Sequence, residues 1–482
     1  MTFPDHTVEK IGGTSMSQVN QLLDTLFIAD REGEALYHRV FVVSAFGGIT
    51  DLLLEHKKSG TPGVYARFAN DDDEHGWLDA LTDVSRAMRD AHAEILEHPG
   101  DRNMADEFVR ERIEGARSCL FDQQRLCSYG HFRIGDHMLV IRELLSGLGE
   151  AHSAFVTALL LQRAGVNARF VDLSGWRDES EHTLDQRIAQ GLNDVDLATE
   201  LPIITGYAQC SEGLMREFDR GYSEVTFARI AAYTQAREAI IHKEFHLSSA
   251  DPKLVGADAV RKLGHTNYDV ADQLSNLGME AIHPKAAKTL RQAEVPLRVT
   301  NAFDPGDPGT LIDDAAAEEP GVEIVTGLGV VALELFEQDM VGVKGYDATA
   351  LDALKRHNVW IVSKSSNANT ITHYVHASLK TAKRVIRDIE ETYPQAEVQA
   401  RSLSLVAVIG RDLSGQSVLR RGLQALEEAG IEVVAAQQTT RNVDVQFVVP
   451  REAGDEAVRR LHDAFVTQGE ENPGEKPLSR AA

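Results

Sequence analysis

Two glycine-rich segments near the start of the chain combine a cation with exposed backbone amides. Lys10 precedes Gly12 and Gly13 at the end of a strand-like segment, and Gly48 lies in a second turn of this kind within residues 44–51. Glycine has no side chain, so its backbone N–H can approach phosphate oxygens closely. A Gly-Gly turn alone is more often only a turn, and neither segment matches the common G-x-x-x-x-G-K-[ST] loop. Two such loops at the carboxyl ends of neighbouring strands indicate a phosphate-binding site more strongly than one.

The elements that must position these loops alternate between strands and helices. This alternation predicts an α/β domain with a mainly parallel sheet sandwiched by helices. The strand-like runs are residues 168–173, 201–206, 239–242 and 296–300, and the helical patterns include residues 77–98, 103–120, 153–164 and 223–236.

The last third of the chain repeats one order of elements. Residues 304–321 are acidic and rich in alanine, and we interpret them as a domain boundary. The sequence after the boundary predicts the order strand, helix, strand, strand, and this order occurs twice. The first set is residues 325–335, 347–357, 359–363 and 370–375, and the second is residues 403–410, 416–429, 431–436 and 444–449.

Composition narrows the classes of partner. The 482 residues contain 49 basic and 74 acidic side chains, a net charge of −25, which would repel nucleic acid and anionic membranes. No basic segment followed by an apolar one, the pattern of a secretory signal, is readable at the N-terminus. The three cysteines, Cys119, Cys127 and Cys210, lack the spacing of metal ligands. We therefore expect a cytoplasmic protein without disulfides. The acidic excess suits a salty cytoplasm, although it often reflects solubility alone.

The glycine-rich segments resemble those of the aspartate kinases. Residues 10–15, Lys-Ile-Gly-Gly-Thr-Ser, are similar to the family's lysine-phenylalanine-glycine-glycine-threonine-serine, and residues 44–51 are similar to its second loop. Further motifs in the same order extend the resemblance over nearly the whole chain. It implies that the Lys10 side chain and the amides of the glycines contact ATP phosphates, while Ser44 and Thr50 add hydrogen bonds to the substrate.

A glutamate and a serine on the next motif imply a site for the substrate's ammonium group. Glu150, after Gly149 and before Ser153, is similar to the family's glycine-glutamate-x-x-serine at the start of a helix, where the glutamate meets the ammonium. The alternative is a helix-start carboxylate that interacts with the helix dipole, which is worth about 0.3–1 kcal/mol.

Residues 219–224 stand where the family has glycine-arginine-glycine-glycine-serine-aspartate. Arg220 could hold the substrate carboxylate through two parallel hydrogen bonds, which lysine does poorly, and Ser223 could add another. Glu224 replaces the family's aspartate, and we expect Lys10 and Glu224 to be the catalytic residues. In a solvated loop Arg220 and Glu224 could instead pair with each other and contribute little.

The nucleotide side departs from the family. Asp251 and Lys253 lie in a motif similar to threonine-alanine-aspartate-proline-arginine, which contacts the nucleotide, but residues 242–248 lose the family's aspartate, glycine and tyrosine. Glu280 occupies the place of a lysine expected near the ATP phosphates, where a carboxylate would repel them. We expect Lys243 or Lys285 to supply the missing charge.

The repeated tail resembles a pair of ACT modules, which are βαββαβ units that bind amino acids. Met340 and Gly342 fit the family's methionine-x-glycine, and residues 363–371 stand at its serine-rich effector turn. The residues expected to contact an effector are Met340, Gly342, Ser366, Asn367 and Asn369. The alternative is an edge turn that only packs a dimer.

The resemblance as a whole implies an ATP- and Mg²⁺-dependent kinase that phosphorylates the side-chain carboxylate of L-aspartate, with no metal held by dedicated protein ligands. We expect a catalytic domain at residues 1–313, ACT-like modules at residues 322–395 and 396–470, a flexible tail at residues 471–482, and a homodimer or higher oligomer. Two rivals stay open: a kinase for another small acid, such as glutamate or N-acetylglutamate, and a catalytically silent amino-acid sensor. The departures from the family and the acidic charge resemble the form associated with ectoine synthesis.

Overall fold

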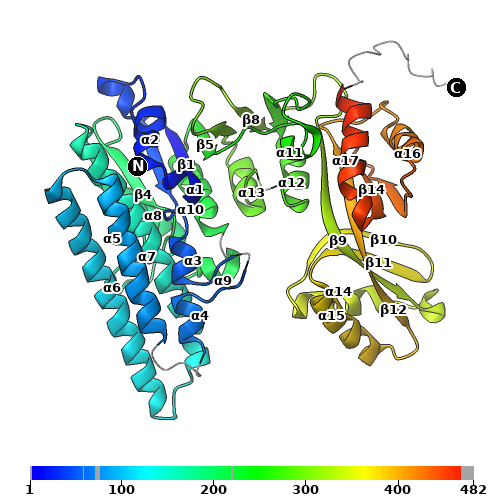
Figure 1. Ribbon diagram of the computed structural model, residues 1–482, viewed down its shortest axis with the longest axis horizontal. Coiled ribbons are helices and arrows are strands. Elements are labelled where there is room, and N and C mark those ends of the chain that lie inside the picture. The colour runs from blue at the N-terminus through cyan, green and yellow to red at the C-terminus, as the bar shows by residue number, and fades with distance from the viewer. Residues whose placement is uncertain (1–2, 58, 71–75, 219–220, 280, 468–482) are drawn as a thin grey trace. The chain divides into compact units, whose positions relative to one another are not determined.

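The computed structural model describes residues 3–57, 59–70, 76–218, 221–279 and 281–467, which divide into two compact units (Figure 1). The first unit comprises Met1–His246 and Ile282–Asp313, and the second comprises Leu247–Ala281 and Asp314–Ala482. The segment between residues 247 and 281 therefore packs with the second unit. The domain bounds proposed from the sequence stay a prediction.

The first unit is built on a mainly parallel sheet, as the alternating pattern predicts. Its strands lie in the order β3-β4-β2-β1-β5-β7-β8, and every neighbouring pair is parallel except β7 with β8. The strands are β1 Thr7–Ile11, β2 Arg39–Val43, β3 Ala168–Val171, β4 Leu201–Thr205, β5 Glu238–Lys243, β7 Leu297–Asn301 and β8 Thr310–Asp313.

Helices cover both faces of this sheet. Every residue of β1, β2 and β4 is buried, which requires cover on both sides and is typical of parallel sheets. Helix α7 packs against β2, β3 and β4, while α10 packs against β1, β2 and β5. The helices are α1 Gly13–Met16, α2 Val19–Leu22, α3 Ile49–Leu53, α4 Val64–Phe68, α5 Gly76–Ile95, α6 Pro99–Ser128, α7 Ile134–Arg163, α8 Leu184–Leu192, α9 Leu214–Phe218, α10 Tyr222–Thr234 and α13 Pro284–Gln292.

Helices α5, α6 and α7 pack side by side as long helices (Figure 1). Among the described residues, α7 is the one helix long and apolar enough to cross a membrane by length and composition, and 83% of its most apolar stretch is buried inside the structure. Such burial is typical of a core helix.

The strand register brings the carboxyl ends of the central strands to one edge. Ile11 at the end of β1 pairs with Val43 at the end of β2 and with His242 in β5, and Val43 pairs with Thr205 at the end of β4. The loops that follow these strands therefore begin side by side, which is the usual position of a ligand site in an open parallel sheet.

The second unit is built on an antiparallel sheet with the strand order β10-β11-β9-β12-β14-β13. Strand β9 pairs with β12 along its whole length, from Ile324 with Ile409 to Phe336 with Glu397. The strands are β9 Ile324–Phe336, β10 Trp360–Ser366, β11 Thr370–His376, β12 Glu397–Ile409, β13 Ala435–Gln438 and β14 Asp444–Pro450, and the short strand β6 is His265–Asn267.

Alternate side chains of this antiparallel sheet face two different sets of helices. On β12, Leu405 and Ala407 pack with α12, whereas Val406 and Val408 pack with α16 and α17. Helices α14 and α15 cover the neighbouring part of the second face. The helices are α11 Pro252–Val255, α12 Tyr268–Asn276, α14 Tyr346–Arg356, α15 Leu379–Thr392, α16 Val418–Glu428 and α17 Gly454–His462. The order strand, helix, strand, strand occurs twice, so the predicted repeat is confirmed.

Candidate active site

Two lysines and one glutamate form the charged centre of the first unit. Lys10 Nζ on β1 and Lys243 Nζ on β5 each lie 3.5 Å from Glu224 Oε1 on α10. Burial would raise the pKa of Glu224, but the charges of Lys10 and Lys243 outweigh burial and lower it to about 2. Glu224 is therefore ionised, and it is largely buried in α10, which corrects the expectation of a solvated loop for this residue.

The second carboxylate oxygen of Glu224 is fixed by the backbone. The N–H of His283 donates a 2.5 Å hydrogen bond to Glu224 Oε2. His283 lies directly before α13, so this contact ties α10 to the start of that helix. A contact made by the backbone of His283 could not be read from a side-chain pattern in the sequence.

The two glycine-rich loops contact each other at the carboxyl ends of β1 and β2. A Cβ atom on Gly13 would lie 2.8 Å from the carbonyl oxygen of Ala45, and the N–H of Gly47 donates to Ser17 Oγ at 2.9 Å. Gly48 has a φ of +83°, a conformation that other residues rarely adopt. Gly12 lies beside Lys10, since a Cβ atom there would be 3.9 Å from Lys10 Nζ. The predicted pairing of loops with a lysine is therefore present.

Hydroxyl groups hold these loops to their neighbours. The Ser15 hydroxyl donates to Glu244 Oε1 at 2.6 Å, which ties the first loop to the segment after β5. The Ser153 hydroxyl on α7 donates to the carbonyl oxygen of Ser44 at 2.8 Å, and this contact holds the second loop. Thr50 lies in the first turn of α3, directly after Gly48 and Ile49, and is partly exposed.

A buried carboxylate on α7 lies close to the charged centre. Glu150 is 1% exposed, and its Oε1 accepts a 2.5 Å hydrogen bond from the Ser223 hydroxyl on α10. Burial raises the pKa of Glu150 to about 8, although the Ser223 hydrogen bond and the charge of Lys10 oppose the shift. Glu150 Oε2 is buried without a hydrogen bond of ordinary length and angle to the described residues, although the Tyr207 N–H and the Tyr222 hydroxyl also lie near enough to the carboxylate to oppose the rise of its pKa. A positively charged donor is the natural partner for such an oxygen.

The surroundings of Glu150 correct one expectation. The sequence pattern places it at the start of a helix, but α7 begins at Ile134, so Glu150 lies within the helix. Gly149 allows this packing, since a Cβ there would be 2.9 Å from Ala45 Cβ in the second loop. Contact with that loop therefore outweighs the low helix propensity of glycine. The carboxylate is too far from the helix start to interact with its dipole, which removes the alternative role.

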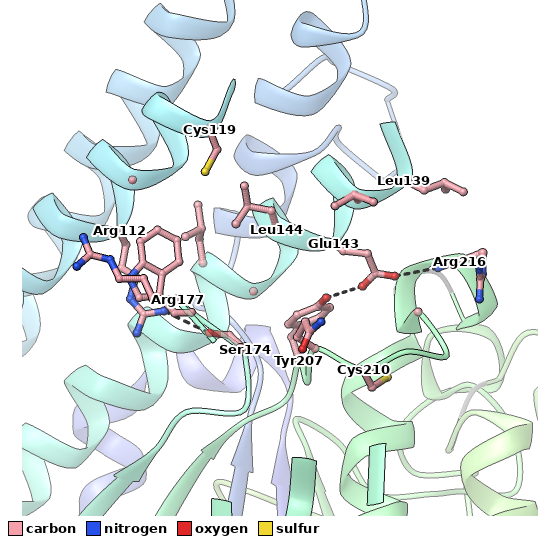
Figure 2. A pocket seen from close by; sticks show the side chains of 18 of the residues that line it. Arg112, Cys119, Leu139, Glu143, Leu144, Ser174, Arg177, Tyr207, Cys210 and Arg216 are labelled. Carbon is pink, nitrogen blue, oxygen red and sulfur yellow. Dashed lines mark hydrogen bonds between the residues drawn. The ribbon is translucent and has the colours of Figure 1, made fainter. Parts of the chain in front are cut away.

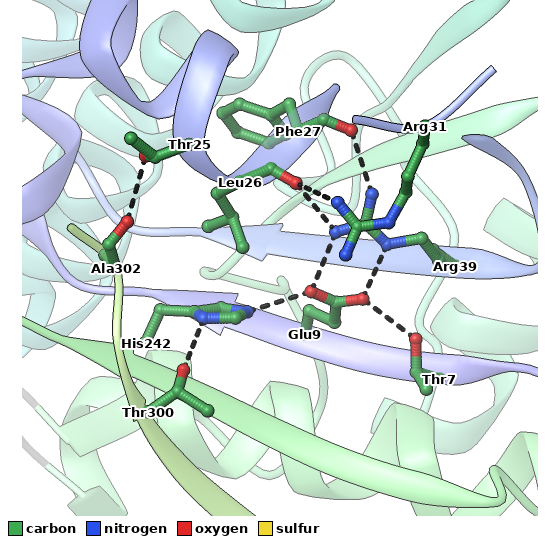
Figure 3. Close-up of polar contacts among 10 residues, drawn as sticks. All are labelled: Thr7, Glu9, Thr25, Leu26, Phe27, Arg31, Arg39, His242, Thr300 and Ala302. Carbon is green, nitrogen blue, oxygen red and sulfur yellow. Dashed lines mark hydrogen bonds and ion pairs between the residues drawn. The ribbon is translucent and has the colours of Figure 1, made fainter. Parts of the chain in front are cut away.

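A buried polar network joins four strands, β1, β2, β5 and β7 (Figure 3). Arg39 Nε on β2 donates to Glu9 Oε1 on β1 at 2.8 Å, and His242 Nε2 on β5 lies 2.8 Å from Glu9 Oε2. The Thr300 hydroxyl on β7 lies 2.7 Å from His242 Nδ1. Although burial alone would raise the pKa of Glu9, Arg39 and His242 hold it far below its usual value. The network fixes the strand that carries Lys10, and sequence reasoning missed it.

A histidine lies between two aspartates at the ends of β5 and β7. His246 Nε2 is 3.0 Å from Asp304 Oδ2, and its Nδ1 is 3.7 Å from Asp307 Oδ1. The ligand atoms of these side chains lie within 4.8 Å of one another, a spacing that could suit a metal ion. The contact with Asp304 is a hydrogen bond, whereas the 3.7 Å contact with Asp307 is an ion-pair distance, so we describe the group as a polar cluster.

The remaining predicted nucleotide residues belong to the second unit. Asp251 caps α11, because its Oδ1 accepts a 2.9 Å hydrogen bond from the N–H of Lys253, and both residues are exposed. Arg220 and Glu280 lie outside the described residues. Lys285, the other candidate for the missing charge, lies 3.5 Å from Glu217.

The predicted effector residues lie at two turns of the second unit. Asn367 Oδ1 accepts hydrogen bonds from the N–H groups of Asn369 and Thr370 at 3.1 and 2.9 Å, which closes the turn between β10 and β11. Met340 is buried against α14 and α15, and Gly342 follows it with a φ of +77°. Ser366 is the last residue of β10.

Comparison with known proteins identifies the family. Residues 5–301 match the amino acid kinase family, and residues 406–465 match an ACT domain. The chain is 52% identical to "Aspartate kinase Ask_Ect" of Stutzerimonas stutzeri over 96% of this chain and 97% of that protein. The chain belongs to the aspartate kinases.

More distant relatives and solved structures agree with this assignment. The kinase is 24% identical to the chloroplastic aspartokinase 3 of Arabidopsis thaliana over 95% of this chain and 81% of that protein. Its fold is that of E. coli aspartokinase III in complex with lysine and aspartate, with a TM-score of 0.73, 19% identity and coverage of 96% of this chain and 100% of that one. The resemblance drawn from the sequence motifs is confirmed, and the kinase uses ATP.

Proposed function

We propose that the kinase transfers the γ-phosphoryl group of ATP to the side-chain carboxylate of L-aspartate, giving 4-phospho-L-aspartate and ADP. One observation carries the proposal: Lys10 and Lys243 converge on Glu224 at the edge where the two glycine-rich loops meet, and the buried Glu150 lies close by with one oxygen unpaired. This arrangement offers cations and amides for phosphate and an anion for the ammonium group of an amino acid.

The lysines act on the transferred group by electrostatics. In phosphoryl transfer, negative charge spreads over the oxygens of the migrating group, and fixed cations stabilise that charge. Glu224 holds Lys10 and Lys243 beside each other, at 3.5 Å from the same oxygen. The amides of Gly12, Gly13 and Gly48 add donors that no side chain screens.

The acceptor needs no general base. A side-chain carboxyl of free aspartate has a pKa near 4, so it is already an anion at neutral pH. Lys10 therefore bridges phosphate oxygens and accepts no proton. The site must instead hold the aspartate carboxylate in line with the γ-phosphate of ATP and neutralise the repulsion between these two anions.

Glu150 and Ser223 would bind the substrate at its ammonium end. The buried Glu150 Oε2 lacks a hydrogen bond, and an ammonium group would supply a charged donor. Ser44 and Thr50 belong to the second loop and would add hydrogen bonds. Arg220 is proposed to hold a substrate carboxylate, on the strength of the motif alone, since it lies outside the described residues.

The nucleotide would be bound by the Gly12–Gly13 loop and Lys243. On the strength of the motif alone, Asp251 and Lys253 are also proposed to contact the nucleotide. We propose that Mg²⁺ enters with ATP. The nearby carboxylates of Glu224 and Glu244 are already bonded to lysines and to Ser15, so the ion would be held mainly by phosphate oxygens and water, as is common for Mg²⁺ in kinases. Bound there, Mg²⁺ would neutralise part of the phosphate charge.

The second unit is proposed to bind an amino-acid effector at the turns that carry Met340, Gly342, Ser366, Asn367 and Asn369, and to join copies of the chain as a homodimer or higher oligomer. Lysine is the ligand named for the E. coli structure. Titration of the activity with lysine, threonine and methionine identifies the effector, and sedimentation velocity gives the oligomeric state.

The pathway proposed is that of ectoine, in the cytoplasm of a salt-tolerant cell. The relative named Ask_Ect supports this assignment, and the net charge of −25 is consistent with it. The alternative is general synthesis of the aspartate-derived amino acids. The genes that neighbour the gene for this chain distinguish the two.

The decisive test is product formation. We expect the purified chain to release ADP when given L-aspartate, ATP and Mg²⁺, and to form aspartyl hydroxamate when hydroxylamine traps the acyl phosphate. Equal or greater ADP release with glutamate or N-acetylglutamate would instead identify a kinase for another acid. No hydroxamate with any of the three acids would identify a silent sensor.

A further inference from the structure

A cavity of about 520 Å³ lies in the first unit, outside the residues of the candidate active site (Figure 2). It is formed by α6, α7 and the loops that follow β3 and β4, and neither Lys10, Glu150 nor Glu224 lines it. Its volume falls within the roughly 300–1,000 Å³ typical of small-molecule sites. The loops after β3 and β4 lie at the carboxyl edge of the sheet, where ligands of open α/β folds bind.

One wall of the cavity is a fixed indole ring. Trp176 packs against α6, because a Cβ on Gly115 would lie 2.6 Å from the ring. The Arg112 guanidinium lies 4.7 Å from the centres of both the Trp176 and Phe108 rings and donates to Asp172 at 2.5 Å. Arg112 is 7% exposed, and its Nε makes no hydrogen bond to any described residue. These contacts hold the indole as a flat apolar surface against which a ring could stack.

The floor of the cavity is formed by Tyr207 and Glu143, whose polar atoms already make hydrogen bonds. The Tyr207 hydroxyl donates to Glu143 Oε2 at 2.5 Å, and Glu143 Oε1 accepts from the N–H of Met215 at 2.8 Å. The negative charge of Glu143 is thus taken up by neighbouring donors and is poorly placed to attract a cationic ligand.

The rim of the cavity is positively charged. Figure 2 shows Arg112 and Arg177 on one side and Arg216 on the other. Arg177 is exposed and lies 3.5 Å from Glu111, which also accepts from Trp176 Nε1, while Arg216 donates to the carbonyl oxygen of Glu212. In a chain with a net charge of −25, a cavity with arginines at both ends attracts anions.

We propose that this cavity binds a small organic anion with a flat apolar body, such as an aromatic carboxylate. The ring would lie against Trp176 and Leu144, and the negative group would meet Arg177 or Arg216, which bind planar carboxylates through paired N–H donors. The site is separate from the effector site proposed for the second unit.

The cavity shares structural elements with Glu150. Tyr207 lines the cavity and follows Gly206, where a Cβ would lie 2.9 Å from Glu150 Oε2. Glu143 and Glu150 are also on the same helix, α7. A ligand that moves Tyr207 therefore changes the position of the backbone against Glu150. This coupling rests on the proposed function, because it acts through the group assigned to the substrate's ammonium.

Binding can be tested with 1-anilinonaphthalene-8-sulfonate, an aromatic anion that fluoresces in apolar sites. We expect Arg177→Glu and Arg216→Glu, singly, to weaken its binding about tenfold, and Trp176→Leu to weaken it at least as much. Arg110→Glu on α6 is the matched control, since Arg110 is exposed and pairs with the neighbouring Glu107, and it should change binding less than twofold. Circular dichroism tests whether each variant is folded. If Trp176→Leu does not fold, the Arg177→Glu and Arg216→Glu variants decide whether the cavity binds the probe.

Binding unaffected by all three cavity variants would overturn the proposal. Complete displacement of the probe by saturating L-aspartate would also overturn it, because the cavity would then be part of the substrate site, whereas coupling between separate sites changes probe affinity only by the finite factor by which the probe changes KM. So would a change of oligomeric state on adding the probe, which would assign this face to a second copy of the chain. None of these binding results depends on catalysis.

The coupling to aspartate has its own readout. At saturating probe we expect the KM for aspartate to change at least threefold with kcat nearly constant, and Arg216→Glu to abolish the effect. Probe binding without a change in KM would disprove the coupling. A chain that binds the probe but does not phosphorylate aspartate would disprove the proposed function and leave the binding site standing.

Discussion

The Ser223 hydroxyl donates a 2.5 Å hydrogen bond to one oxygen of Glu150 and leaves the other oxygen buried without a hydrogen bond to the described residues. A half-satisfied buried carboxylate costs free energy unless it is protonated or acquires a partner. The raised pKa of Glu150, about 8, reflects this cost. Glu150 and Ser223 are therefore positioned to bind a cationic group, and the protonation state of Glu150 should affect the kinetics.

Aspartate binding should strengthen as pH rises toward 8. Below pH 8 the free enzyme holds Glu150 mainly protonated, since burial raises its pKa to about 8, but the ammonium group of the substrate binds the ionised form. Binding must then release a proton, so kcat/KM for aspartate should rise close to tenfold per pH unit between about pH 6 and 7.5 and level off above 8. Initial rates across this range at saturating ATP measure the effect.

The matched control is Glu150→Gln, which keeps a hydrogen-bond acceptor for Ser223 but cannot ionise. We expect KM for aspartate to rise about 10–100-fold, the loss of one charge-assisted hydrogen bond, and its pH dependence to become flat. A wild-type profile that is flat from pH 6 to 8 would show that Glu150 is not the group that meets the ammonium.

Lys10→Ala should abolish turnover while the aspartate site stays intact. The fixed charge of Lys10 acts on the transferred phosphoryl group, and the loss of such a group typically costs two to three orders of magnitude in kcat. Glu224 keeps Lys243 and the His283 N–H as partners, so the fold should tolerate the change. We expect KM for aspartate to change less than about threefold; Lys288→Ala, an exposed lysine on α13, is the control. Near-normal turnover of Lys10→Ala would refute the assigned role.

Lys243→Ala should weaken ATP selectively. The family's lysine is replaced by Glu280, and Lys243 reaches the same glutamate oxygen as Lys10. If Lys243 supplies the missing phosphate contact, the variant should raise KM for ATP about tenfold or more and leave KM for aspartate nearly unchanged. Isothermal titration with ADP gives the affinity directly. Unchanged nucleotide affinity would leave Lys285 as the candidate.

The parts of this site that could be predicted from sequence are those whose residues are close together in the chain. Lys10, Gly12 and Gly13 follow one strand and Gly48 lies in the turn after the next, and two strand–loop units of a parallel sheet must bring their carboxyl ends to one edge. The structure confirms this arrangement through the register of β1 with β2. Only local periodicity and the rules of parallel sheets were needed.

The parts that could not be predicted depend on contacts between distant residues. Glu9, Arg39 and His242 meet only because β1 lies between β2 and β5, and no local pattern fixes that register. Similarly, the low helix propensity of glycine would favour a helix end at Gly149, but the contact of Gly149 with Ala45 lets α7 continue through it. The segment 247–281 carries a kinase motif, yet its packing places it with the second unit.

Arg39→Met should lower the free energy of unfolding more than a substitution that breaks an exposed ion pair. It leaves the buried Glu9 with His242 as its remaining charged partner, and breaking a buried pair from one side typically costs about 3–5 kcal/mol. Urea unfolding at pH 7 measures the loss. Arg237→Met, which breaks an exposed pair with Asp5, is the control and should cost less than about 1 kcal/mol.

The same network sets a pH dependence of stability. The pKa of Glu9 is far below its unfolded value of about 4.5, so the ionised form stabilises the fold above that pH and the contribution is lost as pH falls below it. The wild type should therefore lose stability more steeply between pH 5 and 3 than Arg39→Met does. Parallel slopes would show that Arg39 does not stabilise the charge of Glu9.

Ser249→Ala should weaken ATP binding by loosening the segment that carries Asp251 and Lys253. The Ser249 hydroxyl lies 2.8 Å from His462 Nε2 on α17 and accepts from the N–H of Arg261, while the Ser249 carbonyl accepts from Val325 N–H on β9. These contacts fix the segment that carries Asp251 and Lys253. Removing the hydroxyl takes this hydrogen-bond partner from the buried His462, at a cost of about 1–3 kcal/mol, and loosens that segment.

We therefore expect Ser249→Ala to raise KM for ATP at least threefold and to leave KM for aspartate unchanged. Ser404→Ala removes a comparable buried hydroxyl on β12, whose partner is the carbonyl oxygen of Arg451, and controls for general loss of stability. If both variants raise KM for ATP equally, the effect is a general softening of the second unit. An effect confined to Ser249→Ala would show that the hydrogen bonds of Ser249 position the segment that carries Asp251 and Lys253.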